Sequence, residues 1–559
     1  MPELTIDGQK IEVEEGTTIL QAAEQLGKDI PVFCYHPGLP PDGNCRMCIV
    51  DVEDNPKLPP SCITECQDDM VVHTDNDNVH EAREGVLEFL LLNHPLDCPI
   101  CDKSGECMLQ DHYFDFSAER SRTVEPKVQK RKVVDVGPHI VLDTERCILC
   151  TRCIRFVENV SKEPSLGIVN RGDRAELTTF PGQELDDPYS LNTCDICPVG
   201  ALTSKEFRFK NRVWFLDHTK TVCPNCSRGC SVRLDHKDGE IQRFMPRHNP
   251  HVNDFWLCDE GRLSFDWVDD KDRLETPLHA ADGGFGAVSW KHVASNLTEE
   301  LTELLAEEAD VTGIMSTRLT NEENFQFVRL LNDELGSDSI TFLDGEKGWL
   351  TELTEDDILR KSDKNPNRKG CELITDAYDL SGGKPWSDGN RSGSSRIVFL
   401  MDPMPFRHLD EDEEDAFKSF LAESELVVQV GTHRSLAPEE VDWVLPGQVW
   451  AEKEGTFTNV NGRVQHFAPA VPSPGKSRAQ LQILSDLASW LDSDQDDLTA
   501  APDPEGIFNT FANEVLGFDW DYTEIGEHGR TVDGKEDPDL SPDVKLIDEA
   551  ETAMAGAEE

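Results

Sequence analysis

The spacing of the cysteines is the feature that most constrains how this chain can fold. The 559 residues include 18 cysteines, and all of them except Cys371 lie before residue 260. The N-terminal stretch MPELTIDGQKIEVEEG has no basic region followed by an apolar one, so we expect no signal peptide and a cytoplasmic location. Thiols stay reduced in that compartment. We therefore interpret the cysteines as metal ligands and not as a disulfide framework.

Sorting by spacing gives four sets of four candidate ligands, which are all cysteines except for one histidine. In order, the first, second, third and fourth sets are Cys34, Cys45, Cys48 and Cys62; His94, Cys98, Cys101 and Cys107; Cys147, Cys150, Cys153 and Cys197; and Cys223, Cys226, Cys230 and Cys258. Three cysteines remain outside these sets, and we interpret each as a small buried apolar residue. They are Cys66, Cys194 and Cys371.

The third set has the spacing that most favours an iron–sulfur cluster. Its segment CILCTRC supplies three thiols from one tight loop, and Cys197, directly before Pro198, supplies the fourth. A four-iron cubane is held by four cysteines, often with the last one before a proline. The first set follows the plant-type two-iron spacing, with a longer first gap. Structural zinc is the alternative for every set, and most of all for the fourth.

Strand and helix signals divide the chain into a cysteine-rich part and an α/β part. Two short strands joined at Asp7 and Gly8 precede a helix that begins at a threonine cap and ends at Gly27. A helix within HEAREGVLEFLLLNHP then leads to the second set. After about residue 260 the runs VTGIM, RIVFLM and LVVQVG predict buried parallel strands. Between the first two of these runs, Thr320 and Glu323 form a capping-box pattern at the start of a helix.

That helix carries Val328, Leu331 and Leu335 on one predicted face, as a helix packed on a sheet would.

The ordered motifs resemble one known family. The segments HPLDCPICDKSGEC, CILCTRC with CPVGAL, and CPNCSRGC are similar to those of the large iron–sulfur subunit of bacterial complex I, the NADH-quinone oxidoreductase, over roughly residues 1–270. Weaker similarity continues through TNEENFQFVRLLNDELGS, NPNRKG and WAEKEGTFTNVNGRVQ. These segments resemble the molybdopterin-oxidoreductase-like region of the same subunits.

The resemblance implies α+β ferredoxin-like iron–sulfur modules followed by an α/β molybdopterin-oxidoreductase-like domain that lacks its cofactor. The domains expected are a two-iron ferredoxin-type β-grasp domain at 1–80, a four-iron module with one histidine ligand at 81–120, a four-iron ferredoxin-like domain at 121–215, a four-iron domain of molybdopterin-oxidoreductase type at 216–272, the degenerate α/β domain at 273–495, and an acidic, flexible tail at 496–559.

The same resemblance implies the cofactors and the function. It assigns one 2Fe-2S cluster to the first set and a 4Fe-4S cluster to each of the other three, with His94 as a ligand. A neutral imidazole in place of a thiolate removes one negative charge, and histidine ligation raises the potential of Rieske centres. The chain would pass electrons from a flavin subunit towards quinone, without a complete active site of its own and without molybdenum.

The implied partners are the other subunits of the peripheral arm, including the one that binds FMN and NADH. The chain would not insert into the membrane, and the complex would hold it at the inner face of the cell membrane.

Three alternatives to this function are an NAD-linked hydrogenase subunit, a formate dehydrogenase subunit and a scaffold without catalytic function. NAD-linked hydrogenases and formate dehydrogenases share similar motifs, but Val157 stands where their two-cluster ferredoxin domain would continue its first cysteine run. Nucleotide loops are incomplete, because GGFGAV lacks the third glycine of a dinucleotide-binding fingerprint and PGKS at Pro474–Ser477 has Ala470 where a phosphate loop needs glycine. The third alternative is a non-catalytic scaffold stabilised by metals.

The charge of the chain limits its partners. The sequence has 53 Lys and Arg against 109 Asp and Glu, a formal net charge of -56. Such a field repels nucleic acid and anionic membrane surfaces. The acid excess runs along the whole chain, which suggests a halophilic source, because a Debye length of about 3 Å at 1 M salt screens the self-repulsion.

Overall fold

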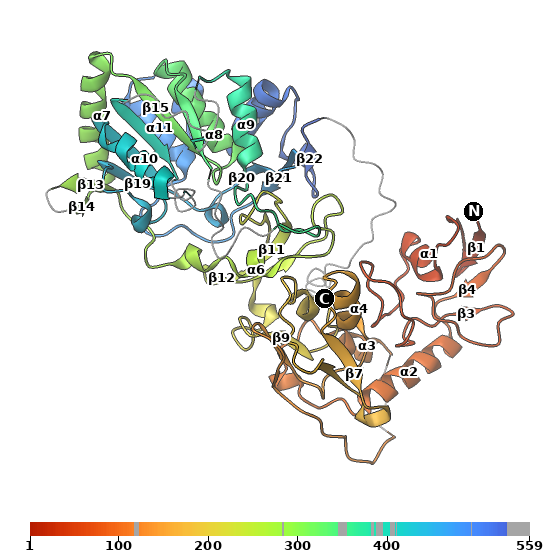
Figure 1. Ribbon diagram of the computed structural model, residues 1–559. Coiled ribbons are helices and arrows are strands. Elements are labelled where there is room, and N and C mark those ends of the chain that lie inside the picture. Colours follow the sequence, from red (N-terminus) through yellow and green to blue (C-terminus); the bar gives the residue numbers. More distant parts are fainter. Residues whose placement is uncertain are drawn as a thin grey trace. The chain divides into compact units, whose positions relative to one another are not determined.

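The computed structural model describes residues 1–116, 122–281, 284–344, 355–381, 385–386, 395–402, 409, 411–493 and 495–533. The chain forms two compact units, the first ending at Leu216 and the second beginning at Asp217. Figure 1 labels many of their helices and strands.

Among its described residues, the first unit combines three small sheets with five α-helices. Its strands are β1 (Glu3–Ile6), β2 (Gln9–Glu12), β3 (Asp51–Val52), β4 (Val71–His73), β5 (Val134–Asp135), β6 (Ile140–Leu142), β7 (Leu166–Val169), β8 (Glu176–Thr179) and β9 (Leu202–Ser204). Its helices are α1 (Ile19–Gln25), α2 (Asp77–Leu91), α3 (Met108–Phe116), α4 (Arg152–Asn159) and α5 (Asn192–Asp195). The sheet orders are β2-β1-β4-β3, β5-β6-β9 and β7-β8.

The N-terminal hairpin and helix confirm the sequence prediction. β1 and β2 pair antiparallel, and Asp7 and Gly8 between them have φ of 46° and 80°. Two residues of positive φ give the turn whose twist matches that of a strand pair. The Thr18 side chain caps α1 by accepting from the Gln21 N–H, and Gly27 follows the helix with φ of 67°.

α2 begins at Asp77, earlier than the segment from His80 that the sequence predicted. The Asn76 side chain sets this start, because it accepts a hydrogen bond from the Val79 N–H at 3.0 Å. The FLLL run that closes the helix begins with Phe89, which is 76% exposed. Among the described residues, no helix is long and apolar enough to cross a membrane.

The second unit contains a seven-stranded sheet and two three-stranded sheets. Its strands are β10 (Asp217–Val222), β11 (Ser231–Lys237), β12 (Glu240–Pro246), β13 (Leu278–Ala281), β14 (Gly284–Ala287), β15 (Val311–Ser316), β16 (Ile340–Leu343), β17 (Ile397–Met401), β18 (Leu426–Gly431), β19 (Trp443–Pro446), β20 (Gly455–Thr458), β21 (Arg463–Phe467) and β22 (Arg530–Thr531). Its helices are α6 (Asp259–Leu263), α7 (Trp290–Ala306), α8 (Asn321–Arg329), α9 (Arg368–Ala377), α10 (Glu411–Ala422), α11 (Gln480–Trp490), α12 (Asp496–Thr499), α13 (Pro504–Phe511) and α14 (Tyr522–Ile525).

The large sheet has the order β14-β13-β19-β18-β17-β15-β16, and its strands from β19 to β16 are parallel. Both faces are buried. Ile397, Phe399 and Met401 of β17 belong to one core with residues of α7, α8 and α11, whereas Val398 and Leu400 belong to another with residues of α10. Burial on both faces explains why β17 and β18 are nearly continuous apolar runs, as the sequence predicted.

The capping box of α8 is also confirmed. The Glu323 N–H donates to the Thr320 hydroxyl at 3.1 Å, and the Thr320 N–H donates to the Glu323 carboxylate at 2.9 Å. Val328 and Leu331 are fully buried, and Leu335 is partly buried against the same core. The predicted face is therefore present, although the backbone changes from α-helix to π-helix after Arg329.

The prediction of an acidic flexible tail from residue 496 was wrong for residues 496–533. α12, α13 and α14 lie there, and β22 pairs with β21. Phe508, Phe511, Trp520 and Ile525 are buried in the main core of the second unit. Burial of these apolar side chains stabilises the ordered segment. The prediction failed because it rested on the average composition, in which the many carboxylates outweigh the few apolar residues. Residues 534–559 lie outside the described residues.

Phe511→Ala tests this packing. The ring is fully buried, and its centroid lies 5.8 Å from that of Phe325 in α8. Removing it leaves a cavity, so we expect the free energy of unfolding to fall by about 3–5 kcal/mol. Phe114→Ala is the control, because Phe114 is 78% exposed and its loss should change stability by only about 0.5 kcal/mol. Urea unfolding measures the change in unfolding free energy of the two variants. Equal changes would contradict a packed C-terminal segment.

Candidate metal centres

The first set lies on the loops that follow α1 and flank β3. Cys34 follows α1, Cys45 and Cys48 precede β3, and Cys62 lies between β3 and β4. The Cys34 N–H donates to Cys45 Sγ at 3.4 Å. Hydrogen bonds from the Cys45 and Cys62 thiols lower the pKa of Cys34, which itself raises the pKa of both partners. A hydrogen bond with the Cys62 thiol also lowers the pKa of Cys48, so all four thiols of the set are neighbours.

The second set follows α2 and ends at the start of α3. Cys101 and Cys107 are buried, whereas Cys98 is exposed. Burial lowers the pKa of His94 to about 4, and Lys127 acts in the same direction. The His94 Nδ1 atom is buried and makes no hydrogen bond with any described residue. The imidazole is therefore neutral at pH 7 and retains an unused nitrogen, the form in which histidine binds metals.

Arg146 connects His94 with the thiols of the second set. Its guanidinium opposes the charged form of His94. Burial raises the pKa of Cys101, and the same guanidinium acts against that rise. The guanidinium is held by Asp97, to which its Nη2 donates at 3.0 Å, and by Asp143 at 3.3 Å. The same cation thus acts on both His94 and Cys101.

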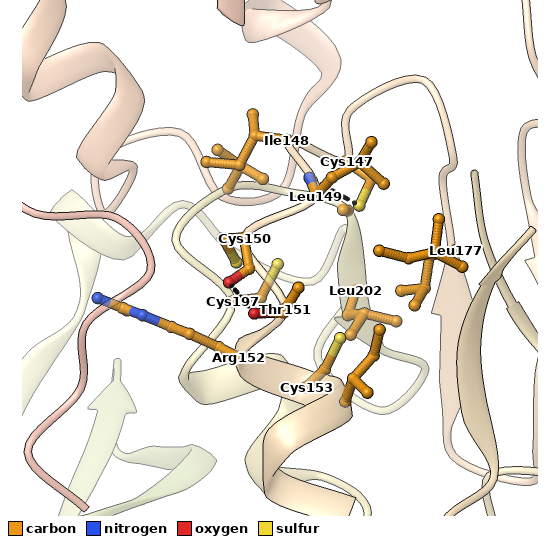
Figure 2. Close-up of a pocket in the computed structure, with 14 residues that line it drawn as sticks. Cys147, Ile148, Leu149, Cys150, Thr151, Arg152, Cys153, Leu177, Cys197 and Leu202 are labelled. Carbon is orange, nitrogen blue, oxygen red and sulfur yellow. Dashed lines mark hydrogen bonds between the residues drawn. The ribbon is translucent and has the colours of Figure 1, made fainter. Parts of the chain in front are cut away.

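The third set lines one pocket. Figure 2 shows Cys147, Cys150, Cys153 and Cys197 around it, with apolar walls that include Leu177 and Leu202. The loop is tightly wound, since Leu149 and Thr151 have φ of 56° and 64°, and the Leu149 N–H donates to Cys147 Sγ at 3.4 Å. Positive φ is uncommon outside glycine, and such residues often occur at functional sites.

Burial controls the protonation of the third set. It raises the pKa of Cys147 to about 12 and that of Cys150 to about 11, and neighbouring thiols of the set add to this effect. The protein alone therefore favours neutral thiols. A bound metal would supply the positive charge that thiolates need in this pocket.

The fourth set lies in the second unit, on the β10–β11 hairpin and at the start of α6. The Cys223 N–H donates to the Cys230 carbonyl at 2.9 Å, which closes the loop that also carries Cys226. Cys258 is the N-cap of α6, where its Sγ accepts from the Gly261 N–H at 3.3 Å. Burial raises the pKa of Cys223 to about 12.

Two cations lie near the fourth set, Lys364 fully buried and Arg318 partly buried. Lys364 is 1% exposed, and its Nζ donates to the Glu260 carboxylate at 2.8 Å. Arg318 donates to the Pro224 carbonyl, between the first two cysteines of the set, at 3.1 Å. Burial lowers the pKa of Arg318, while the Cys223 and Cys226 thiolates raise it.

The candidate ligands of a set lie near one another, but their donor atoms are not arranged as a tetrahedron around one metal ion. Among the described residues, no three His, Cys, Asp or Glu side chains converge as a site for one metal ion does.

Loops of different sets touch within the first unit. A Cβ built at Gly200 would lie 2.2 Å from Cys101 Sγ, which brings the segment after Cys197 directly against the second set. Thr151 of the third-set loop donates to Asp42 of the first-set loop at 2.7 Å. The first three sets therefore occupy adjoining loops.

The prediction that the three cysteines outside the sets are buried is confirmed for two of them. Cys66 and Cys371 are buried, as predicted, but Cys194 is only partly buried. Cys371 lies in α9.

The incomplete nucleotide motifs have other structural roles. Gly284–Ala287 of GGFGAV forms strand β14, while Gly283 lies outside the described residues. The Lys476 N–H of PGKS donates to the Glu275 carbonyl.

Gly200 and Arg146 were not singled out from the sequence. A glycine two residues after Pro198 and an arginine directly before Cys147 were the available signals.

Family models match five parts of the chain. They are described as 2Fe-2S iron-sulfur cluster binding domain (residues 2–77), NADH-ubiquinone oxidoreductase-G iron-sulfur binding region (83–122), NADH-quinone oxidoreductase subunit 3, ferredoxin-like domain (137–203), Molybdopterin oxidoreductase Fe4S4 domain (216–270) and Molybdopterin oxidoreductase (380–490). These matches define an iron–sulfur protein in which ferredoxin-like domains precede a molybdopterin oxidoreductase domain.

Individual relatives agree with this class. The NADH-quinone oxidoreductase G subunit of Rickettsia felis is 42% identical over 341 residues, which cover 61% of this chain and 50% of that protein. The Streptomyces coelicolor protein of the same name is 41% identical, over 61% of this chain and 40% of its own. The mitochondrial NADH-ubiquinone oxidoreductase 78 kDa subunit of Candida albicans is 31% identical, over 88% of this chain and 83% of its own.

The chain belongs to the family of the large iron–sulfur subunit of NADH-quinone oxidoreductase, which includes the mitochondrial 78 kDa subunit. Its match spans about half the length of the Rickettsia relative. A solved NAD+-reducing NiFe-hydrogenase in the H2-reduced state is 32% identical, with a TM-score of 0.35, over 38% of this chain and 91% of its own.

Gly200→Ala tests the close approach between the second and third sets. The added Cβ would overlap Cys101 Sγ and lie 3.2 Å from Lys103 Cβ, so we expect the first unit to lose about 1–3 kcal/mol of unfolding free energy. Gly85→Ala is the matched control. Nothing lies within 4 Å of its added Cβ in α2, and it should gain about 0.5–1 kcal/mol. Denaturant unfolding of the two variants should therefore give opposite signs, and a neutral Gly200→Ala would rule out the close approach.

Proposed function

We propose that the chain carries electrons through four iron–sulfur clusters in the peripheral arm of an NADH-quinone oxidoreductase, from a flavin subunit towards quinone. The first set would hold a 2Fe-2S cluster, and each of the other three sets would hold a 4Fe-4S cluster. When bound, these clusters accept and release single electrons. The chain itself binds, spaces and tunes them.

The observation that carries this proposal is the contact between the loops of the first three sets. Gly200 lies directly against Cys101, and Thr151 is hydrogen-bonded to Asp42. Electron transfer slows as redox centres move apart, so adjoining ligand loops suit a conductor better than isolated structural metals do.

The donors fit the proposed groups chemically. Thiols whose pKa is raised by burial become good ligands once iron supplies positive charge. His94 offers a neutral imidazole with a buried Nδ1 that makes no hydrogen bond with the described part of the chain. Burial, with Lys127 and Arg146 acting in the same direction, lowers the pKa of His94 and so keeps this imidazole in its neutral, ligating form.

The partners follow from the proposed role. The subunit that binds FMN and NADH would deliver electrons, and other peripheral-arm subunits would accept them. The whole arm would lie at the inner face of the cell membrane. The molybdopterin oxidoreductase domain would bind no molybdenum in this chain. Cys371 would not be a ligand, because its thiol in α9 lies against the Ser316 carbonyl, to which it donates at 3.6 Å. The halophilic source also stays a prediction.

Iron and sulfide analysis tests the cluster assignment. Four filled sets correspond to about fourteen irons per chain after anaerobic reconstitution. About ten irons together with one zinc would show that the fourth set is a zinc site. Removal of the metals by a chelator should also lower the melting temperature, since the ligand loops contain little regular structure.

Substitution of His94 separates a ligand from a packing residue. His94→Ala should eliminate or shift one four-iron signal and leave the other clusters unchanged. His94→Cys should keep that cluster and lower its potential, because a fourth thiolate adds negative charge near the iron. Redox titration followed by electron paramagnetic resonance measures both. Wild-type spectra and midpoints in the two variants would show that the imidazole does not bind iron.

A further inference from the structure

Two buried arginines of α4 connect the loops that carry the first three sets. Arg152 and Arg155 are 6% and 9% exposed. They are three residues apart, so they lie on neighbouring positions of one helix face. Neither is among the candidate ligands, and both are surrounded by the segments that carry those ligands.

The Arg152 guanidinium reaches three separate segments. It donates to the Tyr35 carbonyl, to the Ile196 carbonyl at 3.1 Å, and towards Met108 Sδ at 3.7 Å. Figure 2 shows this side chain pointing away from the thiol pocket of the third set. Each acceptor is the chain neighbour of a candidate ligand: Tyr35 follows Cys34, Met108 follows Cys107 and Ile196 precedes Cys197.

Arg155 makes a second connection, between the first and third sets only. Its Nη groups donate to the Cys34 and Pro40 carbonyls, and Nη2 also lies 3.5 Å from the Cys150 carbonyl. Its Nε donates to the Thr151 hydroxyl at 3.1 Å. None of these four contacts of Arg155 reaches the second set.

These contacts have a geometric and an electrostatic consequence. A guanidinium presents five donors in a rigid plane, so acceptors that share it are fixed relative to one another. It also keeps its positive charge when buried, and charges interact strongly in an interior of low dielectric constant. A cation close to a redox centre stabilises the reduced, more negative state of that centre.

We propose that Arg152 and Arg155 are positioning residues that fix the spacing of the three redox centres of the first unit and raise their reduction potentials. Arg152 acts on all three, and Arg155 acts on the centres of the first and third sets. This inference rests on the proposed function, because it requires clusters at these sets.

The test compares variants of the full chain after anaerobic reconstitution. Arg152→Met should lower the midpoints of the first three clusters, so that the ratio of oxidised to reduced cluster at the wild-type midpoint rises on the order of tenfold. Arg155→Met should do the same for the first and third clusters only. The fourth cluster, bound in the second unit, is an internal control. Arg174→Met is the matched control, since the Arg174 side chain is 70% exposed in the first unit.

Arg152→Lys separates charge from geometry and covers the case in which the Met variant does not fold. Lysine keeps the charge but not the planar fork. The midpoints should stay near wild type, while the mutual enhancement of spin relaxation, which depends on the distance between clusters, should change.

Different results identify different failures. Wild-type protein without iron–sulfur signals would reject the proposed function itself. With wild-type clusters present, unchanged midpoints and relaxation in the Arg152 variants would overturn the positioning role. Equal shifts in all four clusters, or in Arg174→Met, would also overturn it, because they would indicate a general effect of lost charge. Loss of iron from the first three sets of an Arg152 variant, with the fourth set still filled, would support the positioning role.

Discussion

The first unit depends on hydrogen bonds from buried guanidinium groups to the carbonyl oxygens of its ligand loops. These loops contain little helix or strand, so their buried carbonyls need partners from elsewhere in the chain. Arg152 and Arg155 supply them from α4, and Arg83 donates from α2 to the Ile49 carbonyl at 3.1 Å. Because each donor group is charged, one interaction both orders a loop and changes the potential at its thiols. In the proposed function, structure and redox tuning in this unit would therefore have a common physical origin.

The second unit holds its cysteines differently. The fourth set lies on a hairpin and a helix N-terminus, and the C-terminal segment packs against the same hairpin. Lys220 of β10 pairs with Glu527 at 2.8 Å, and the Asn249 side chain donates to the His528 carbonyl at 3.1 Å. The segment whose composition resembled a solvated tail therefore stabilises a ligand-bearing domain. Buried ion pairs such as Lys453 with Glu323, 2.7 Å apart, join α8 to the loop before β20 in the same unit.

Family membership and the geometry of the sets support one function from different directions. The family matches establish iron–sulfur binding domains and a molybdopterin oxidoreductase domain. The geometry adds which loops adjoin and which side chains connect them. Cluster number, the absence of molybdenum and the direction of electron flow are proposals that follow from the two together.

The sequence by itself determined the local features. The Asp7–Gly8 turn, the Thr18 and Thr320 caps and the β17 strand were predictable because each depends on residues within a few positions. The four sets were recognisable because a ligand loop needs fixed spacing. Only the tertiary structure decided how these parts meet. Arg152 is 117 positions from Tyr35 and 44 from Ile196, and no periodicity or motif encodes contacts over such separations. The same holds for Gly200 and Phe511, whose roles come from the side chains that the completed fold brings against them.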